Sequence, residues 1–292
     1  MREVGGHVSA AGGVELAIER AVEIGGNCVQ IFSGSPRVWV RPALSKFDAQ
    51  KIAAKREEKH VGSIITHSLY LVNLASDNPE LVEKSKKALA FDLEFDAHIK
   101  GNGVVVHVGS HKGNGWEQCR DAVLVAIADL VEHAPETSHF LIENAASRNG
   151  KIGGDLSEVA WLISHLKSKN VGWCFDTCHA FASGYSLGKI QAAGSTVTTT
   201  AEQAILELDL WSSLKCVHVN DSRDPFASGR DRHDNLGDGA IPQGDLEYFL
   251  NLPQLQHLPL ILEVPGDQKE GPDLDNLNRL KNLIHEPQKV QS

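Results

Sequence analysis

Residues 171–176 read VGWCFD, a continuous apolar run that ends on a carboxylate. Runs of the same kind recur on both sides of it along the chain: REVGGHV (2–8), NCVQIF (27–32), SIITH (63–67), GVVVHV (103–108), HFLIE (139–143), KCVHVN (215–220) and PLILEV (259–264). Several of these runs are apolar without alternation, which is typical of strands that are buried on both faces of a parallel sheet. The sequence therefore predicts eight short strands.

Helix-like stretches separate these strands. Asn78 and Pro79 have the pattern of a helix start, Gly101 lies beyond the end of that helix, and Asp155 with Glu158 resembles a capping box. The apolar spacing of amphipathic helices recurs at residues 13–25, 47–60, 116–134 and 273–285. Alternating strands and helices indicate right-handed βαβ units, and eight such units close into a (β/α)₈ TIM barrel of the α/β class.

The chain contains no linker or break in composition that would divide it, so we expect a single domain over residues 1–292. Irregular loops are expected at about 184–200, which is rich in Gly, Ser and Thr, and at 221–244, which is charged and rich in Gly. Because the active site of a TIM barrel lies at the carboxyl ends of its strands, the functional residues are expected there.

Composition excludes several classes of protein. With 41% hydrophobic and 23% charged residues among 292, the chain is neither disordered, collagen-like nor a coiled coil. No apolar run approaches 18 residues, so we predict no membrane span and no secretory signal. The five Cys are odd in number and form no C-x-x-C pair, which favours reduced thiols in an intracellular, cytoplasmic protein.

Metal-ligand residue types stand at the ends of six of the predicted strands: His67, His107, Glu143, Asp176, His218 and Glu263. Taken alone, His107 within an apolar run has the ordinary explanation of a core histidine. A carboxylate at the end of a buried strand, as at Glu143 and Glu263, must be paired, protonated or bound to a metal. Six such residues around one barrel mouth therefore predict a metal site.

Two clusters extend this ring. His179 follows Asp176 by three residues, and Asp231 and His233 alternate in an extended segment, so their side chains point the same way. The resulting five imidazoles and four carboxylates favour Zn²⁺ or Mn²⁺/Fe²⁺ over Mg²⁺ or Ca²⁺. Nine ligands exceed the needs of one ion, and multi-metal sites perform phosphoryl transfer and hydrolysis. Bound cations would also attract phosphate to a chain whose formal net charge is −10.

Several long motifs then follow one another along nearly the whole chain: GGHVSAAGG, HSLYLVNLAS, HVGSH, LIEN, FDTCHAFASGY, HVNDS, GRDRHDNLGDG and LILEVPG. With these motifs the chain resembles the endonuclease IV family, the zinc-dependent AP endonucleases of base-excision repair. It departs from the family in GGHVS, where GAHVS is common, and in EVPG, where Glu-Thr-Pro is more usual. Neither departure removes a candidate ligand.

The resemblance implies three zinc ions, with Mn²⁺ as a possible substitute. The implied ligand sets are His67, His107 and Glu143 for the first, Asp176, His218 and Glu263 with bridging Glu143 for the second, and His179, Asp231 and His233 for the third. It further implies hydrolysis of the phosphodiester 5′ to an abasic site, with Glu143 and Glu263 positioning the attacking water. The implied partner is double-stranded DNA containing abasic sites, bound by a monomer.

By the same resemblance, Arg37, Tyr70 and Leu71 are candidates for entering the DNA where the damaged nucleotide is drawn out. His7, His111 and Asn220 are expected to support ligands or contact phosphate, and Cys174 and Cys178 to be buried structural thiols. Two alternatives remain open from sequence: a metal-dependent sugar isomerase or epimerase on the same barrel, and a catalytically dead module that binds abasic DNA. The third ligand set argues against the isomerase, and the intact ligands argue against the dead module.

Overall fold

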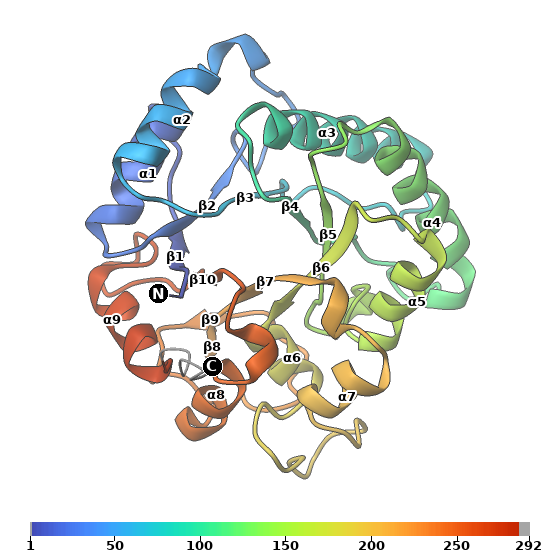
Figure 1. The fold of residues 1–292 in the computed structure, drawn as a ribbon. Helices are drawn as coiled ribbons and strands as arrows, with labels where there is room; N and C mark the ends of the chain where they lie inside the picture. Colours follow the sequence, from blue (N-terminus) through green and yellow to red (C-terminus); the bar gives the residue numbers. More distant parts are fainter. Residues whose placement is uncertain (1, 286–292) are drawn as a thin grey trace, which may run out of the picture.

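Eight parallel strands pair edge to edge and close into a barrel in the computed structural model, which describes residues 2–285 (Figure 1). The barrel strands are β1 (Val4–His7), β2 (Cys28–Phe32), β3 (Ile64–His67), β4 (Val104–Val106), β5 (Phe140–Glu143), β6 (Val171–Asp176), β7 (Leu214–His218) and β10 (Leu260–Leu262). They neighbour one another in chain order, and β10 pairs with both β7 and β1 to close the ring. The predicted (β/α)₈ barrel is confirmed. The predicted domain also takes in residues 1 and 286–292, which lie outside the described residues.

Helices surround the barrel (Figure 1). Their buried apolar residues pack together with outward side chains of the strands, such as Val104, Phe140 and Ile142. The α-helices are α1 (Val14–Glu23), α2 (Ala49–Glu58), α3 (Pro79–His98), α4 (Trp116–His133), α5 (Leu156–Leu166), α6 (Thr177–Ser183), α7 (Ala201–Glu207), α8 (Gln243–Leu250) and α9 (Leu274–Leu283). Short 3₁₀ turns lie at Leu44–Lys46, Arg148–Gly150, Trp211–Ser213 and Pro253–Leu255. Every helix predicted from apolar spacing is present, whereas α6, α7 and α8 were not predicted.

The predicted helix starts are found with one difference. The Asn78 side chain accepts a hydrogen bond from the backbone of Glu80 and caps α3. Asp155 caps α5 by accepting from Ser157 N, but Glu158 accepts from Gly153 N at 2.7 Å and does not reach back to the cap. The capping-box interpretation of this start is therefore half right, because the loop before α5 folds back and offers Glu158 a nearer donor.

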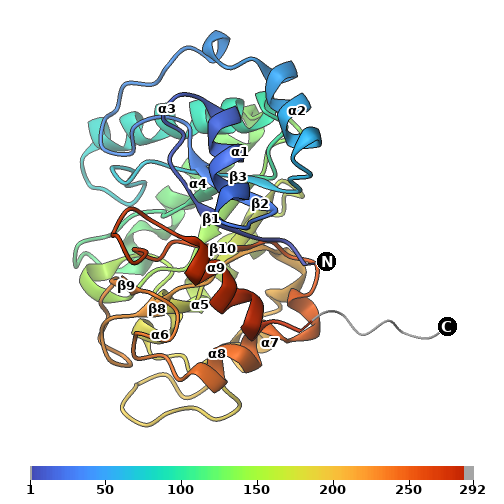
Figure 2. The ribbon, with the colours of Figure 1, turned by 90° about the vertical axis from the view of Figure 1, so that its left-hand side faces the viewer.

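The two long loops behave differently. Residues 184–200 contain no helix or strand, as predicted. Residues 221–244 instead contain a small antiparallel hairpin, β8 (Asp221–Ser222) with β9 (His233–Asp234). The buried Asp221 carboxylate organises this loop by accepting backbone hydrogen bonds from three later residues, Gly237, Gly239 and Ile241. In Figure 2 the hairpin lies on the left, on the opposite side of the barrel from the amino terminus.

Side chains inside the barrel form two layers. The lower layer is apolar and contains Gly5, Cys28, Ile65, Val105, Leu141, Cys174, Cys216 and Ile261, one residue from each strand. Two residues further along each chain segment lie His7, Gln30, His67, His107, Glu143, Asp176, His218 and Glu263. Because alternate residues of a strand face the same side, this second set forms a polar layer directly above an apolar floor.

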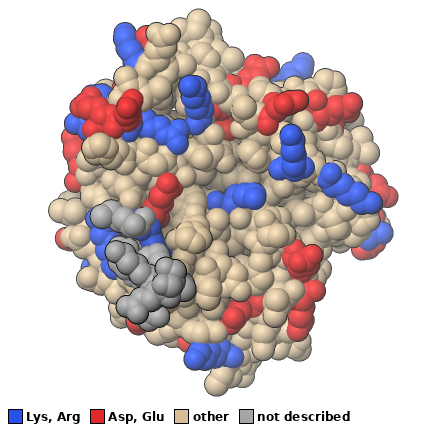
Figure 3. All heavy atoms as spheres, in the orientation of Figure 1, with Lys and Arg blue, Asp and Glu red and all other residues tan. Residues whose placement is uncertain are grey.

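Figure 3 shows the face of the molecule at which the strands begin, opposite the polar layer. Acidic and basic side chains are interspersed on its visible part, and neither sign forms a continuous patch. None of the helices within residues 2–285 is both long and apolar enough to span a membrane.

Helix α3 carries a carboxyl group, Asp96, whose protonation affects stability. Its oxygens accept hydrogen bonds from Thr66 Oγ1, Gly103 N and Ser138 Oγ, yet burial dominates and raises the pKa of Asp96 to about 7. A raised carboxyl pKa means that folding favours the protonated form. Stability is therefore lost as pH rises from the unfolded pKa near 4 to about 7.

We expect Asp96→Asn, which keeps the shape without the charge, to be more stable relative to wild type at pH 8 than at pH 5. The change in relative stability should be on the order of a few kcal/mol, from about 1.4 kcal/mol per pKa unit. Thermal melts of both proteins across this pH range measure it. A difference in melting temperature that does not vary with pH would contradict an ionising Asp96.

Candidate metal centre

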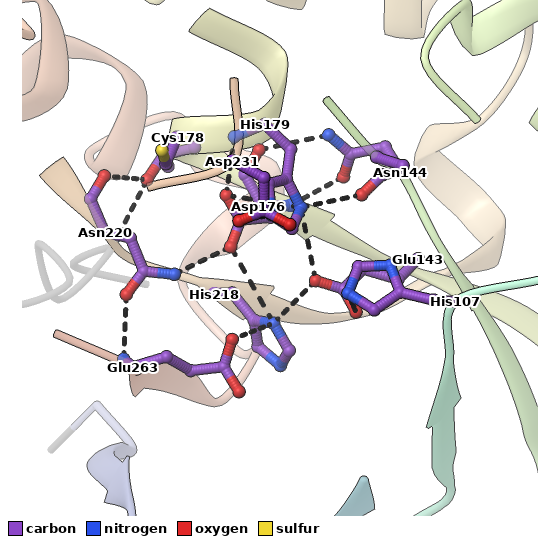
Figure 4. Close-up of polar contacts among 12 residues, drawn as sticks. His107, Glu143, Asn144, Asp176, Cys178, His179, His218, Asn220, Asp231 and Glu263 are labelled. Atoms are coloured by element: carbon purple, nitrogen blue, oxygen red, sulfur yellow. Dashed lines mark hydrogen bonds and ion pairs between the residues drawn. The ribbon is translucent and has the colours of Figure 1, made fainter. Parts of the chain in front are cut away.

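All nine candidate ligands predicted from sequence lie at the mouth of the barrel where the strands end. A cavity of about 1070 Å³ opens there, and six candidates line it: His67, His107, His179, Asp231, His233 and Glu263. The remaining three, Glu143, Asp176 and His218, are fully buried beneath it. Figure 4 shows side chains from separate strands and loops converging on one another.

The first group is formed by His67, His107 and Glu143. His67 and Glu143 are the last residues of β3 and β5, and His107 follows the end of β4. Glu143 Oε2 lies 3.3 Å from His67 Nε2 and 3.2 Å from His107 Nε2, and it is buried without a hydrogen-bond partner among the described residues. Zinc bonds of 2.0–2.1 Å in a tetrahedron separate the ligand atoms by about 3.3 Å, so this orphaned oxygen and its neighbours fit a zinc ion.

The second group is formed around His218, the last residue of β7. Its Nδ1 lies 3.1 Å from Glu143 Oε1, 3.2 Å from Glu263 Oε2 and 3.9 Å from Asp176 Oδ2 (Figure 4). Glu143 thus turns one carboxylate oxygen to each of the first two groups. The four residues Glu143, Asp176, His218 and Glu263 place ligand atoms within 4.8 Å of one another.

The third group contains His179, Asp231 and His233. Asp231 Oδ1 lies 3.0 Å from His179 Nε2 and 3.5 Å from His233 Nε2, and the two imidazole nitrogens are 3.5 Å apart. The sequence predicts a turn between Asp176 and His179, but helix α6 begins there, and Asp176 Oδ1 caps it by accepting from His179 N at 2.7 Å. Asp176 Oδ2 is 3.7 Å from His233 Nε2, so Asp176 lies between the second and third groups.

Hydrogen bonds at the second ring nitrogen fix the orientation of most of the candidate histidine ligands. Four histidines bond an acceptor with the nitrogen that does not face the other ligands of their own group: His67 Nδ1 with Ser68 O at 2.7 Å, His179 Nδ1 with Asn144 O at 2.9 Å, His233 Nδ1 with Glu263 O at 3.2 Å, and His218 Nε2 with Gln30 Oε1 at 2.8 Å. An acceptor at the outer nitrogen keeps a proton there and leaves the inner nitrogen free for a metal.

Neighbouring polar residues hold the carboxylates. Asn220 Nδ2 donates to Asp176 Oδ2 at 2.7 Å, and Asn220 Oδ1 accepts from Glu263 N at 2.8 Å. His7 Nδ1 lies 2.8 Å from Glu263 Oε1. Of the three residues expected to support ligands or contact phosphate, His7 and Asn220 lie against ligands. His111 instead accepts backbone hydrogen bonds within its own loop, from residues 113 and 115.

The metal-free cluster has strongly shifted pKa values. Burial would lower the pKa of His179 and His218, but the carboxylates around them outweigh it and raise both well above the usual value. Burial would raise the pKa of Glu143, but His107 and His218 hold it well below its usual range. The pKa of His107 falls to about 4 because burial dominates. Metal binding at His179 and His218 must therefore release protons, whereas Glu143 and His107 have already lost theirs at neutral pH.

Sequence reasoning missed Gln30 and Lys151. Gln30 lies two residues after a buried Cys on β2, the same alternation that places the ligands of the other strands, so its position was a usable signal. Lys151 Nζ donates to Asp231 Oδ2 at 2.8 Å from a loop that carries no such signal. It also borders a hollow of about 470 Å³ whose lining includes Arg148, Arg230 and Arg232.

The three candidate DNA-inserting residues lie at the same mouth. Tyr70 is 58% exposed and lines the cavity beside the partly buried Leu71. Arg37 is exposed on the neighbouring loop, which contacts Tyr70 through a hydrogen bond from Tyr70 N to Pro36 O at 3.1 Å. Cys174 and Cys178 are free buried thiols, as predicted, and burial raises the pKa of Cys178 to about 12.

Comparison with known proteins first gives the fold class of this chain. Residues 18–283 match the family described as the xylose isomerase-like TIM barrel. Among solved structures of this class, a D-tagatose 3-epimerase-like protein has a TM-score of 0.69 at 18% identity over 96% of this chain and 95% of its own, which reflects the shared fold.

Two proteins with higher sequence identity to this chain identify the family within this fold class. "Probable endonuclease 4" of Sulfurihydrogenibium is 34% identical over 287 residues, covering 97% of this chain and 100% of its own. The crystal structure of endonuclease IV from Thermus thermophilus has a TM-score of 0.81 at 31% identity, covering 96% and 98% of the two chains. The chain belongs to the endonuclease IV family.

Proposed function

We propose that this protein is a DNA-repair endonuclease that hydrolyses the phosphodiester 5′ to an abasic site and leaves a 3′-hydroxyl and a 5′-deoxyribose phosphate. The observation that carries this proposal is the convergence of nine ligand-type side chains, in three adjoining groups, beneath one open cavity. Membership of the endonuclease IV family supports the choice of reaction. A 3′-repair phosphodiesterase activity, acting on the same kind of bond, belongs to the proposal.

The proposed holders of three zinc ions are His67, His107 and Glu143 for the first, Asp176, His218 and Glu263 with shared Glu143 for the second, and His179, Asp231 and His233 for the third. Mixed imidazole and carboxylate donors without a cysteine suit Zn²⁺, with Mn²⁺ as a substitute. Divalent ions supply a nucleophilic water at neutral pH and stabilise charge on the leaving oxygen.

The chain itself positions the reactants. We assign Glu143 and Glu263 the orientation of the attacking water, because one oxygen of each lies within 3.2 Å of His218 Nδ1 at the centre of the second group. Glu263 Oε1 is occupied by Gln30 Nε2 at 2.7 Å, which leaves Oε2 directed at the centre. Lys151, next to Asp231, places a positive charge where the phosphate would enter. No side chain acts as a covalent nucleophile in this proposal.

The proposed partner is double-stranded DNA with an abasic site. Three arginines and Lys151 surround the hollow beside the cavity, and the buried carboxylate of Asp224 holds two of them, Arg230 and Arg232, in place. These four cations outnumber the two carboxylates that pair with them, Asp224 and Asp231, so the hollow has a local excess of positive charge that suits a phosphate backbone. We propose that the protein acts as a monomer in the cytoplasm, at the nucleoid if the cell is bacterial, and that the whole chain forms one domain.

Tyr70 is proposed to contact the duplex beside the extruded nucleotide, with Arg37 and Leu71. We expect Tyr70→Ala to weaken binding of an abasic duplex about 10-fold or more, since stacking of a base on an aromatic ring contributes about 1–3 kcal/mol. Equilibrium binding measured in chelator, where no incision occurs, checks this. Tyr70→Phe keeps the ring and should bind like wild type; equal binding by Tyr70→Ala would remove Tyr70 from the DNA contact.

One experiment distinguishes the three candidate functions: AP endonuclease, sugar isomerase or epimerase, and catalytically dead DNA-binding module. The zinc-loaded protein is incubated with a duplex holding a single abasic site and, separately, with a ketose. Incision at the abasic site supports the proposal. Epimerisation of the ketose without incision would establish the sugar isomerase alternative, and tight binding without any product would establish a catalytically dead module.

A further inference from the structure

Gln30 is a fully buried polar residue in the middle of β2, and its carboxamide joins two candidate ligands of the second group. Its Oε1 lies 2.8 Å from His218 Nε2, and its Nε2 lies 2.7 Å from Glu263 Oε1. The same nitrogen is 3.0 Å from His7 Nδ1. A side chain buried at this depth with all its polar atoms engaged is fixed in one orientation.

The carboxylate determines which way the amide points. An ionised carboxylate only accepts hydrogen bonds, so the amide nitrogen must face Glu263, and the amide oxygen must then face His218. An amide oxygen only accepts, so His218 must keep a proton on Nε2. The lone pair available to a metal is therefore on His218 Nδ1, the atom that faces Glu143 and Glu263.

Gln30 bonds a candidate histidine ligand through a side chain, whereas backbone groups orient three of the other four. The outer nitrogens of His67, His179 and His233 bond backbone carbonyls. His107 Nδ1 is buried and has no hydrogen-bond partner among the described residues. Within residues 2–285, and leaving aside the candidate ligands themselves, Gln30 is thus the one side chain that hydrogen-bonds the outer nitrogen of a candidate histidine ligand, and a substitution can remove it.

We propose that Gln30 is a positioning residue that sets the zinc affinity of the second group, formed by Asp176, His218 and Glu263. It fixes the protonated nitrogen of His218 and the rotamer of Glu263 at once, so that both ligands are aimed before the ion arrives. The inference rests on the proposed function for the identity of the metal. It assigns Gln30 no contact with the substrate.

The test is zinc release from Gln30→Leu, which removes both hydrogen bonds at similar volume. The purified, zinc-loaded proteins are titrated with a competing chelator, and bound zinc is counted by elemental analysis. We expect one of the three ions to be released at about 10- to 100-fold lower chelator strength, the usual effect of losing an outer-shell partner, with the other two unchanged. The absorption spectrum of the cobalt-substituted protein should change for one site only.

Gln30→Met is measured in parallel, so that a folding defect in one variant does not decide the matter. Gln191→Leu is the matched control, because Gln191 bonds backbone atoms of the 184–200 loop and lies outside the cavity lining. The control should retain all three ions with wild-type affinity. Wild-type zinc affinity in both Gln30 variants would overturn the inference, and so would an equal weakening of all three ions.

These outcomes are independent of the proposed reaction. If wild type fails to incise abasic DNA but a Gln30 variant loses one ion selectively, the reaction falls and the positioning role stands. If wild type incises and the variants bind zinc normally, the positioning role falls alone. A wild-type protein that binds no zinc overturns both.

Discussion

Replacing Glu143 by alanine is expected to lower the incision of abasic DNA by more than about 100-fold, beyond what loss of an outer-shell partner costs. The reason is its central place: Oε2 lies within 3.3 Å of two imidazoles of the first group, and Oε1 lies 3.1 Å from His218 of the second. No other carboxylate among the described residues reaches both groups. The same change should remove more than one equivalent of bound zinc, because it takes a ligand from two groups at once.

Single-turnover incision rates and zinc content by elemental analysis measure this result together. Glu143→Gln keeps the volume and should be nearly as inactive, since an amide replaces the charged ligand. Glu94→Ala, on the exposed face of α3, is the control for a lost carboxylate and should behave as wild type. Near-normal turnover in Glu143→Ala, with the protein folded, would refute the role assigned to Glu143.

Removing the metal is the second change with a large expected effect. Dialysis against a strong chelator should abolish incision, because in the proposed reaction Glu143 and Glu263 only orient the attacking water and supply no nucleophile of their own. Added Zn²⁺ should restore incision, and Mn²⁺ should restore part of it. Incision that persists in protein verified to be free of metal would exclude a metal-dependent reaction.

The amount of zinc needed to restore incision is expected to depend on pH. In the metal-free protein His179 and His218 have pKa values well above the usual one, so an entering ion must displace their protons. Lower pH therefore weakens metal binding. The zinc concentration that restores half of the activity should rise as pH falls, and isothermal titration in buffers of different ionisation enthalpy should show proton release on binding.

The strands and the candidate ligands were predictable because both depend on local patterns. A buried parallel strand is visible as an apolar run, and its last inward residue falls two positions after an apolar one, as in Cys174 followed by Asp176. Strand boundaries from sequence were within about two residues of those in the structure. His107 and Glu263 lie one residue beyond their strands, which changed nothing about where their side chains point.

What could not be predicted depends on contacts between distant parts of the chain. Gln30 meets His218 across 188 residues, and Lys151 meets Asp231 across 80. The hairpin within residues 221–244 forms because one buried carboxylate, Asp221, collects backbone donors from later in the loop. The alternation on β2 does place Gln30 in the polar layer, but it does not say which residues Gln30 meets, and no apolar spacing or capping pattern reveals these pairings.

The two stacked layers inside the barrel restrict where residues can be inserted into or deleted from this chain. A single inserted or deleted codon within a strand such as β5 or β7 would reverse which residues face inward and exchange a charged group for an aliphatic one. The same change in the 184–200 connection would leave every strand in phase. We therefore expect insertions and deletions to be tolerated better in the connections than in the barrel wall, so that loops at the mouth can vary around a constant centre.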